Sequence, residues 1–342
     1  MKKKADILLI YTGGTIGMIK DYDTGALKAF NFDELLQNIP ELKILEHNID
    51  TLSFEEPIDS SNMDPEGWVQ IATTINSNFE KYDGFVILHG SDTMAYTASA
   101  LSFMFENLSK PVIFTGSQLP IGDLRTDAKE NLITSIQIAG LQKNDRPVIS
   151  EVGLYFEYKL YRANRSTKIN AEHFQAFASM NHPALAESGV YLSVNYNALW
   201  KPNRKQPTKL HTNFNDDVLI LKMFPGISES TIRHILSKEN LRGVVLETYG
   251  SGNAPSDPWF VEILKEKIAE GLIVVNVTQC IAGSVNMGQY ETSVKLKQIG
   301  VVSGKDITTE AAVAKLMYLL GKDLSPEVFK TIFETSLRGE MS

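Results

Sequence analysis

Two patterns of apolar and polar positions alternate along the chain. Short apolar runs bounded by glycine or polar turns predict buried strands, and the clearest are 7–11, 84–88 and 111–115. Longer segments with apolar residues three or four positions apart predict helices, as at 66–79 and 94–108. A strand, a helix and a second strand in that order are typical of a parallel sheet with crossover helices. The first part of the chain is therefore predicted to be α/β.

The same alternation resumes after a change in composition. Residues 201–217 are rich in Lys, Asn, Pro, Gln and Thr and poor in apolar residues, which predicts a linker between domains. The pattern thus predicts a larger N-terminal α/β domain over 1–200, with a parallel-rich sheet, and a smaller, Rossmann-like C-terminal α/β domain over 218–342. The strands predicted after the linker are 218–223, 243–248 and 273–277, and the helices are 228–236, 259–270, 310–320 and 326–337.

Composition narrows the classes of function. The net charge of −8 over 342 residues disfavours nucleic acid and anionic membranes as partners. Cys280 is the only cysteine, so no intrachain disulfide can form and we expect a cytoplasmic location. No apolar stretch approaches the ~20 residues of a membrane span. The six histidines are scattered without ligand spacing, so we expect no metal site.

The first predicted strand ends in a glycine-rich turn over 12–17. Its three glycines and two hydroxyls suit a backbone that turns sharply and lets a substrate approach closely. The turn also follows a parallel strand, at the end where α/β proteins bind ligands. It lacks the lysine of a P-loop, which argues against nucleotide binding. An ordinary turn between a strand and a helix stays equally open.

A second polar turn, 89–93, follows the strand 84–88 and precedes a predicted helix. Free N–H groups at that helix N-terminus favour a substrate carboxylate or an oxyanion. The turn carries three polar side chains, those of Ser91, Asp92 and Thr93. Helix capping explains one of them and not all three. His89 ends a buried strand and is expected to be a hydrogen-bonded structural histidine. The loop 57–65 is rich in side-chain oxygens, which either bind a ligand or cap the next helix, and 161–168, taken alone, is typical of a solvated loop.

Seven motifs occur in order along the chain: YTGGTIGM, PIDSSNM, ILHGSDTMAYTASALSFMFENL, TGSQLPIGDLRTDAKENL, YRANRSTK, ETYGSGNAP and NVTQCIAGSVNMG. Together they resemble the bacterial type I (cytoplasmic) L-asparaginases along almost the full length. The resemblance implies a two-domain asparaginase-like fold with most of the site in the N-terminal domain. It also implies a homodimer or homotetramer, and hydrolysis of L-asparagine to L-aspartate and ammonia without a cofactor.

The resemblance also assigns roles to residues. Thr15 matches the nucleophilic threonine of the family, and Asp92 and Lys168 match its catalytic aspartate and lysine. Ser91 stands where the family usually has a second catalytic threonine. The substrate's α-amino and α-carboxylate groups are expected to bind to Asp59, Ser60, Ser61, Ser91 and Asp92. A threonine hydroxyl needs a neighbouring proton acceptor, and the hypothesis is a relay formed by Ser91, Lys168 and Asp92.

Three positions depart from the family pattern. Serine at position 91 keeps the hydroxyl but loses a methyl that restricts χ1, so looser positioning is expected. The family's flexible-loop tyrosine commonly follows a glycine, but here Ala26 follows Gly25, and Tyr22 is the nearest substitute. Glu247 stands where some bacterial members carry an arginine at a second, cooperative asparagine site. An acidic residue repels a carboxylate, which argues against that regulation.

Two other classes of function stay open. One is a related amidohydrolase, either a glutaminase-asparaginase or an amidotransferase subunit that acts on aminoacyl-tRNA. The net acidity argues against the tRNA version. The other is a catalytically silent amino-acid-binding protein, which the alanine at position 26 favours and which Thr15, Asp92 and Lys168 oppose.

Overall fold

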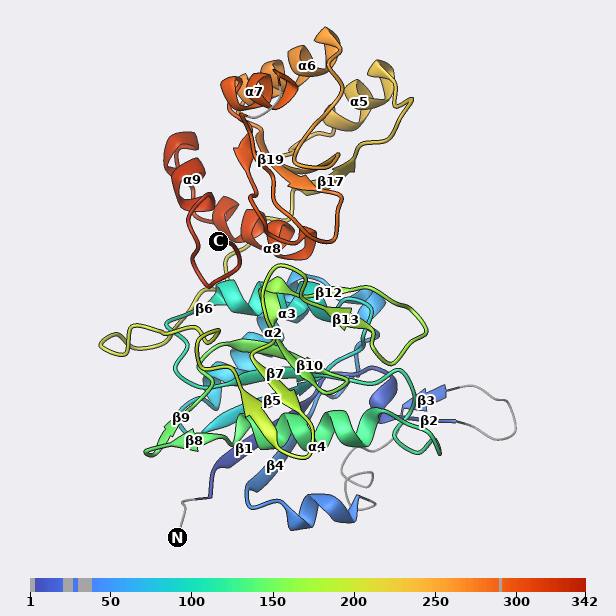
Figure 1. Ribbon diagram of the computed structural model, residues 1–342, viewed down its shortest axis with the longest axis vertical. Helices are drawn as coiled ribbons and strands as arrows, with labels where there is room; N and C mark the ends of the chain where they lie inside the picture. Colours follow the sequence, from blue (N-terminus) through green and yellow to red (C-terminus); the bar gives the residue numbers. More distant parts are fainter. Residues whose placement is uncertain (1–3, 21–26, 30–38, 289–290) are drawn as a thin grey trace. The chain divides into compact units, whose positions relative to one another are not determined.

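The computed structural model describes residues 4–20, 27–29, 39–288 and 291–342 (Figure 1). The chain divides into two compact units, Met1–Thr212 and Asn213–Ser342. The segment up to Thr212 belongs with the first unit because β16 (Lys209–Leu210) pairs antiparallel with β6 (Phe105–Glu106). The predicted linker, 201–217, spans this boundary.

The described part of the first unit is built on an eight-stranded mixed sheet. From one edge to the other, the strands are β15 (Leu192–Val194), β14 (Ala186–Ser188), β11 (Lys159–Arg162), β10 (Val152–Phe156), β7 (Val112–Thr115), β5 (Gly84–Leu88), β1 (Asp6–Tyr11) and β4 (Asn48–Ser53). The five strands from β10 to β4 are parallel, and the other three are antiparallel to their neighbours. The carboxyl ends of β1, β5 and β7 therefore lie next to one another.

Helices cover both faces of this sheet (Figure 1). On one face, α4 (Ala128–Ala139) buries Leu132 and Ile136 in a cluster with Leu9, Val86 and Ile113 of the parallel strands. On the other, α3 (Met94–Met104) packs on β7 and β10, and α2 (Pro65–Ser77) packs on α3. α3 ends four residues earlier than the predicted 108, because Phe105 and Glu106 pair with β16. Strands with both faces covered are apolar throughout, which is why they were recognisable in the sequence.

The basic segment 161–168 is not a solvated loop, and that interpretation was wrong. Arg162 and Arg165 are both buried. The Nε atom of Arg162 lies 2.6 Å from a carboxylate oxygen of Glu151, and its Nη2 donates to the carbonyl of Ala198 at 2.8 Å. Because these N–H groups of Arg162 meet acceptors, burying the charge costs less than it would without partners. Lys168 therefore follows a buried, hydrogen-bonded segment and does not lie on a loose loop.

Short elements connect the main ones in the first unit. The described 3₁₀ turns are Thr15–Gly17, Pro40–Ile44, Ser60–Asn62 and Ala163–Arg165. The described short strands are β2 (Met18–Lys20), β3 (Leu27–Ala29), β8 (Gln142–Lys143), β9 (Arg146–Pro147), β12 (Thr167–Lys168) and β13 (Phe177–Ala178). The sequence also predicts a short helix at 32–39, which lies outside the described residues apart from its last position.

The second unit holds a parallel sheet in the order β17 (Val218–Lys222), β18 (Gly243–Thr248), β19 (Ile273–Thr278) and β20 (Val302–Ser303). Its described helices are α5 (Glu229–Leu236), α6 (Pro258–Ala269), α7 (Glu291–Gln298), α8 (Thr309–Leu320) and α9 (Pro326–Phe333). Val244 and Leu246 of β18 pack with Phe260 and Leu264 of α6 in its core. The predicted class, a larger parallel-rich α/β domain followed by a smaller α/β domain, is confirmed.

A buried ion pair joins two parts of the second unit. Lys315 of α8 and Glu340 have fully buried side chains and lie in direct contact. The Lys315 Nζ also donates to the carbonyls of Phe333 and Thr335, each at 2.7 Å. Burial lowers the pKa of Lys315, and the neighbouring Glu340 opposes part of that effect. The pair therefore attaches the segment after α9 to α8.

Candidate active site

Two glycine-containing turns meet at the carboxyl ends of β1 and β5. The N–H and the hydroxyl of Thr12 both donate to the carbonyl of Leu88, at 3.0 and 2.9 Å. Gly14 has a φ of 90°, and a Cβ on it would lie 2.5 Å from the backbone nitrogen of Gly90. A Cβ on Gly90 would in turn collide with the Ser60 hydroxyl. Only glycine permits this approach, so the backbones after β1 and β5 and the loop of Ser60 are in contact.

Thr15 begins the 3₁₀ turn that follows this contact. Its side chain is half-buried, and its hydroxyl makes no hydrogen bond to any residue that the structure describes. Thr15 and Ser91 each follow one of the two glycines in contact, Gly14 and Gly90. Among the described residues, the Thr15 hydroxyl therefore has free bonding capacity, and Thr15 follows the glycine that contacts the turn of Ser91.

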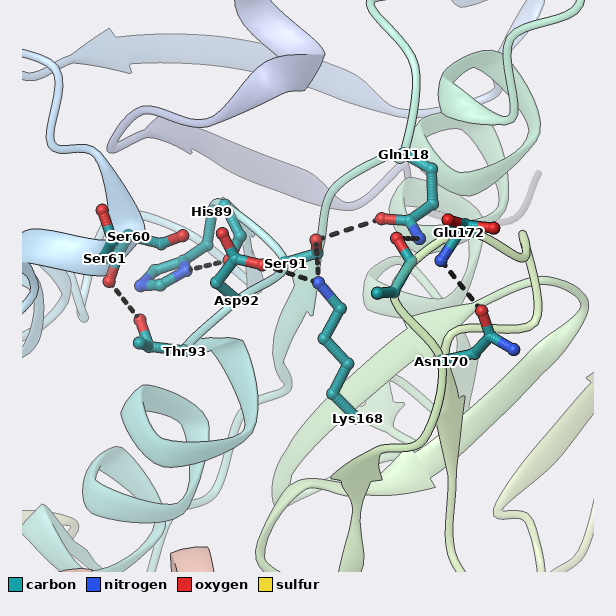
Figure 2. A network of polar contacts seen from close by, with 12 residues as sticks. Ser60, Ser61, His89, Ser91, Asp92, Thr93, Gln118, Lys168, Asn170 and Glu172 are labelled. Atoms are coloured by element: carbon teal, nitrogen blue, oxygen red, sulfur yellow. Dashed lines mark hydrogen bonds and ion pairs between the residues drawn. The ribbon is translucent and has the colours of Figure 1, made fainter.

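Ser91, Asp92 and Lys168 form a hydrogen-bonded group, which Figure 2 shows. The Lys168 Nζ lies 2.9 Å from the Ser91 Oγ and 2.7 Å from an Asp92 carboxylate oxygen. The Lys168 side chain is 18% exposed and that of Asp92 is 67% exposed. The sequence separated these groups by more than seventy positions, and the fold brings them together as the family resemblance implies.

Thr93 occupies the N-cap position of α3 but does not cap the helix. Its hydroxyl donates to the Ser60 carbonyl at 2.7 Å instead (Figure 2). The capping explanation for the polar turn 89–93 is therefore wrong for this residue. The bond links the Ser60 loop to the turn that carries Ser91 and Asp92.

Asp59 and Ser61 form a small turn of their own. The Asp59 carboxylate accepts from the Ser61 N–H at 3.0 Å and from the Ser61 hydroxyl at 2.8 Å. These bonds, the backbone one first, lower the pKa of Asp59, so the carboxylate is ionised at neutral pH. Asp59 is exposed, whereas Ser60 is buried against Gly90. An ionised, exposed carboxylate suits recognition of an ammonium group. The neighbouring helix α2 is capped by Asp64 instead, whose side chain accepts from the Gly67 N–H at 2.8 Å.

His89 is buried directly before this group. Its Nδ1 lies 2.7 Å from the Gly90 carbonyl and donates to it, since a carbonyl only accepts. Burial lowers the pKa of His89 to about 4, so the ring is neutral. The structure thus agrees with the sequence-based interpretation of a structural histidine. Its hydrogen bond holds the peptide that precedes Ser91.

Gln118 belongs to the group and was missed in the sequence. The Ser91 hydroxyl donates to the Gln118 Oε1 at 3.1 Å (Figure 2). The signal for it was available, because Gln118 follows β7 at the same edge of the sheet as the other two turns. Tyr22 and the pair Gly25-Ala26 lie outside the described residues.

Glu247 lies near the end of β18 in the second unit. Its carboxylate accepts from the Thr309 hydroxyl at 2.6 Å and lies 3.5 Å from the Lys222 Nζ. The side chain is largely buried, while Cys280, after β19, is exposed. The carboxylate is therefore already bonded within its own unit.

The described residues contain neither a cluster of metal ligands nor a membrane-spanning helix. Within residues 4–20, 27–29, 39–288 and 291–342, no three His, Cys, Asp or Glu side chains cluster as metal ligands. In the same part of the chain, no helix has the length and apolar character to cross a bilayer.

Comparison with known protein families gives a consistent result for both units. The model of the asparaginase N-terminal domain matches residues 6–200. The model of the glutaminase/asparaginase C-terminal domain matches residues 217–333. The two matches together span both α/β units and all the residues of the site described above.

Individual proteins agree with this result. The chain is 42% identical to L-asparaginase 1 of Escherichia coli, over 100% of this chain and 99% of that protein. It is 40% identical to the 60 kDa lysophospholipase of Mus musculus, over 98% of this chain and 62% of that longer protein. The crystal structure of L-asparaginase I from Vibrio cholerae superimposes with a TM-score of 0.90 at 44% identity, covering 99% and 100% of the two chains. This chain therefore belongs to the asparaginase family.

Proposed function

We propose that this protein hydrolyses L-asparagine to L-aspartate and ammonia, with Thr15 as the nucleophile and an aspartyl ester as the intermediate. The observation that carries the proposal is the group formed by Ser91, Asp92 and Lys168 beside the Gly14–Gly90 contact. It supplies a hydroxyl free to attack and a hydrogen-bonded route for its proton.

The reaction divides into two steps. In the first, the Thr15 Oγ bonds to the side-chain amide carbon. The Lys168 ammonium group gives a proton to the leaving nitrogen, the Ser91 hydroxyl passes its proton to the resulting Lys168 amine, and the Ser91 Oγ takes up the proton of Thr15. The carbon–nitrogen bond breaks and ammonia departs, leaving the ester. In the second, water bonds to the same carbon, the bond to Thr15 breaks, and the Thr15 hydroxyl regains a proton. Asp92 holds the Lys168 ammonium group in place, and N–H groups at the start of α3 stabilise the oxyanion.

The exposed charges of the site account for substrate binding. The ionised carboxylate of Asp59 suits the α-ammonium group, and the hydroxyls of Ser60 and Ser61 suit the α-carboxylate. Ser91 and Asp92 complete this binding surface. The arrangement requires no cofactor.

Replacing Thr15 with alanine tests the nucleophile. We expect Thr15→Ala to lose turnover by several orders of magnitude while it keeps asparagine binding, because only a transition-state interaction is removed. Thr74→Ala is the matched control and should keep full activity, because Thr74 is half-buried like Thr15 but its hydroxyl donates to the Gln70 carbonyl within α2. Wild-type rates in Thr15→Ala would disprove the assignment. Ammonia release from the parent protein separates an enzyme from a silent binding protein.

The choice between asparagine and glutamine tests the substrate. Groups that fix both α-substituents leave the amide carbon at one distance from Thr15, so the extra methylene of glutamine must be accommodated by strain. One methylene discriminates by only ~1–3 kcal/mol, and the preference for asparagine should be finite. Equal kcat/KM values for the two amides would support the alternative, a glutaminase-asparaginase.

We further propose that the chain acts as a homodimer or homotetramer in the cytoplasm, without nucleic-acid or membrane partners. Val190 and Tyr191, between β14 and β15 at the sheet edge, are both highly exposed, which favours a covering subunit. The single cysteine and the net charge of −8 support the other parts. Light scattering coupled to size-exclusion chromatography tests the assembly. A monomeric mass at the protein concentration used in the activity assay would contradict the proposal.

A further inference from the structure

Ser91 is held more firmly than a serine is expected to be. A threonine at this position would carry a methyl group that restricts χ1, whereas a serine hydroxyl rotates among three staggered positions. In this protein the Ser91 Oγ has two bonding partners, Lys168 at 2.9 Å and Gln118 at 3.1 Å. Lys168 belongs to the proposed chemistry. Gln118 has no role in it so far.

The orientation of the Gln118 amide is determined by its other contacts. Its Nε2 donates to the carbonyls of Ala171 and His173, at 3.2 and 3.1 Å (Figure 2). Both partners can only accept, so the nitrogen must face them and Oε1 must face Ser91. While Lys168 is an ammonium group, the Ser91 proton therefore points to Gln118 and a lone pair of Ser91 faces the Lys168 N–H. Ser91 can pass its proton to Lys168 only after Lys168 has given one up. The amide fixes the direction of the hydroxyl as well as its position.

The main chain of Gln118 is held by a buried carboxylate. Asp127, at the start of α4, accepts from the N–H groups of Gln118, at 3.1 and 3.0 Å, and of Leu119, at 3.2 Å. It also accepts from the Asn131 side chain at 3.3 Å, and the same amide group of Asn131 donates to the Gly116 carbonyl at 3.0 Å. Asp127 and Asn131 are both buried. The turn that follows β7 is thus fixed on both sides of Gln118.

The segment that receives the Gln118 amide is ordered by its own turn. The Asn170 side-chain oxygen accepts from the N–H groups of Glu172 and His173, each at 2.8 Å. This turn directs the carbonyls of Ala171 and His173 toward Gln118, and it begins two residues after Lys168. One amide therefore connects the Ser91 turn to the segment that follows Lys168.

We propose that Gln118, held in place by Asp127, is a positioning residue that restrains the Ser91 hydroxyl as the methyl group restrains threonine. This inference rests on the proposed function, because the relay that it serves is the one that activates Thr15. It changes the expectation from the sequence that Ser91 is loosely positioned. It also makes the contribution of Gln118 depend on which residue occupies position 91.

A double-mutant cycle tests the proposal with four proteins: the parent, Gln118→Leu, Ser91→Thr, and the variant with both changes. We expect Gln118→Leu to lower kcat about tenfold when serine is at position 91, the effect of about one hydrogen bond, with little change in KM. When threonine is at position 91, the same change should lower kcat about twofold or less. Asp127→Asn should also lower kcat more with serine than with threonine at position 91, since Asp127 holds the main chain of Gln118. Gln206→Leu, an exposed glutamine bonded to Asn107, is the matched control and should lose nothing in either background.

The possible outcomes separate the two proposals. If the parent does not hydrolyse asparagine, the proposed function fails, whatever the cycle would show. If the parent is active and Gln118→Leu loses the same factor in both backgrounds, or loses none, the positioning role is wrong. Crystal structures give a readout independent of turnover: Ser91 should occupy one rotamer in the parent and several in Gln118→Leu. A single, unchanged rotamer in that variant would overturn the inference even for an inactive protein.

Discussion

Each unit of this protein contains a lysine–carboxylate pair in direct contact, and the two pairs differ in almost everything else. In the first unit, Lys168 and Asp92 are 2.7 Å apart, with side chains 18% and 67% exposed. In the second, Lys315 and Glu340 are both completely buried. Lys315 has two backbone carbonyls as further acceptors, and Glu340 accepts from the N–H groups of Leu337 and Arg338. Every polar group of the buried pair has a partner within the protein.

The difference separates a group available for chemistry from one used for stability. Asp92 is exposed and Ser91 is half-buried, so the fold leaves part of their bonding capacity unused. A buried charge without a partner is costly, so the second pair must be fully bonded or absent. Under the proposed mechanism, a lysine and a carboxylate therefore serve activity in one unit and folding in the other.

The largest expected effect comes from removing Lys168, the partly buried lysine of the first pair. Lys168→Met should lower kcat by ~10²–10⁴-fold, the usual range for a proton-transfer group, while the free energy of unfolding changes by less than ~1 kcal/mol. Steady-state ammonia release and urea unfolding measure the two quantities. Lys267→Met is the matched control, because Lys267 and Glu270 also lie 2.7 Å apart at an exposed position. If Lys168→Met lowered the free energy of unfolding by as many kcal/mol as it raised the activation barrier, the pair would serve stability as well as activity, and the comparison would be wrong.

The buried pair should respond in the opposite way. Lys315→Met leaves the Glu340 carboxylate buried without its cation, which costs ~3–5 kcal/mol of stability. The folded fraction should keep its kcat. Adding Glu340→Gln to Lys315→Met should recover part of the stability, because no unpaired charge then remains. Urea titrations of Lys315→Met, of Glu340→Gln and of the variant with both changes check this. If the double variant lost as much stability as the two single variants together, the expectation would be contradicted.

A smaller effect concerns the pH dependence of stability, to which the buried residue His89 contributes. His89 is next to the exposed group but is buried and neutral, with a pKa lowered to about 4 from the ordinary 6.5. As the pH falls from 6.5 toward 4, His89 is protonated in the unfolded chain but stays neutral in the folded chain, so the free energy of unfolding decreases. One site contributes at most ~1.4 kcal/mol per pH unit, or about 3 kcal/mol over this range.

Urea unfolding of the parent and of His89→Asn across that pH range measures this term. The parent should lose more stability on acidification than the variant does. His234→Asn, at an exposed position on α5, should follow the parent. Parallel curves for the parent and His89→Asn would show that His89 is protonated in the folded state.

The smallest expected effect is on regulation. A second asparagine site that needs a cation would meet Glu247, which is bonded to Thr309 and near Lys222. Repulsion between close, partly screened charges is ~1–4 kcal/mol, comparable to an allosteric coupling of ~1–3 kcal/mol. The rate should therefore rise hyperbolically with asparagine concentration. A sigmoidal curve that became hyperbolic on mutation of Glu247 or Cys280 would show that regulation persists without arginine.

Local patterns predicted the fold well where a segment's own residues decide its structure. β5 and β18 were recognisable because buried parallel strands are continuously apolar. The strand β4 was missed because it lies at the sheet edge, and its sequence mixes apolar and polar residues without a clear alternation. Arg162 was misread because its buried partner, Glu151, comes from another strand end and leaves no mark in the surrounding sequence.

The candidate site was predictable by residue but not by geometry. Motifs that follow strands pointed to Thr15 and Ser91. Only the resemblance pointed to Lys168, and it gave all three residues their expected roles. The restraint on Ser91 was not predictable, because it depends on a glutamine whose main chain is held by Asp127 and whose side chain reaches a third segment. Such a contact follows from the order of strands in the sheet, which a single sequence does not contain.

The strand order also has a consequence for how quickly activity is regained after denaturation. β1 lies between β4 and β5, so its two neighbours come from segments about forty and eighty positions later in the chain. Folding is slow when stabilising contacts join distant positions, because loop-closure entropy is lost before those contacts form. The contact between Ser91 and Lys168 requires β5, β7, β10 and β11 to be assembled already. Helical signal should therefore return early in refolding and turnover last, with the unpaired apolar strands exposed to aggregation between the two.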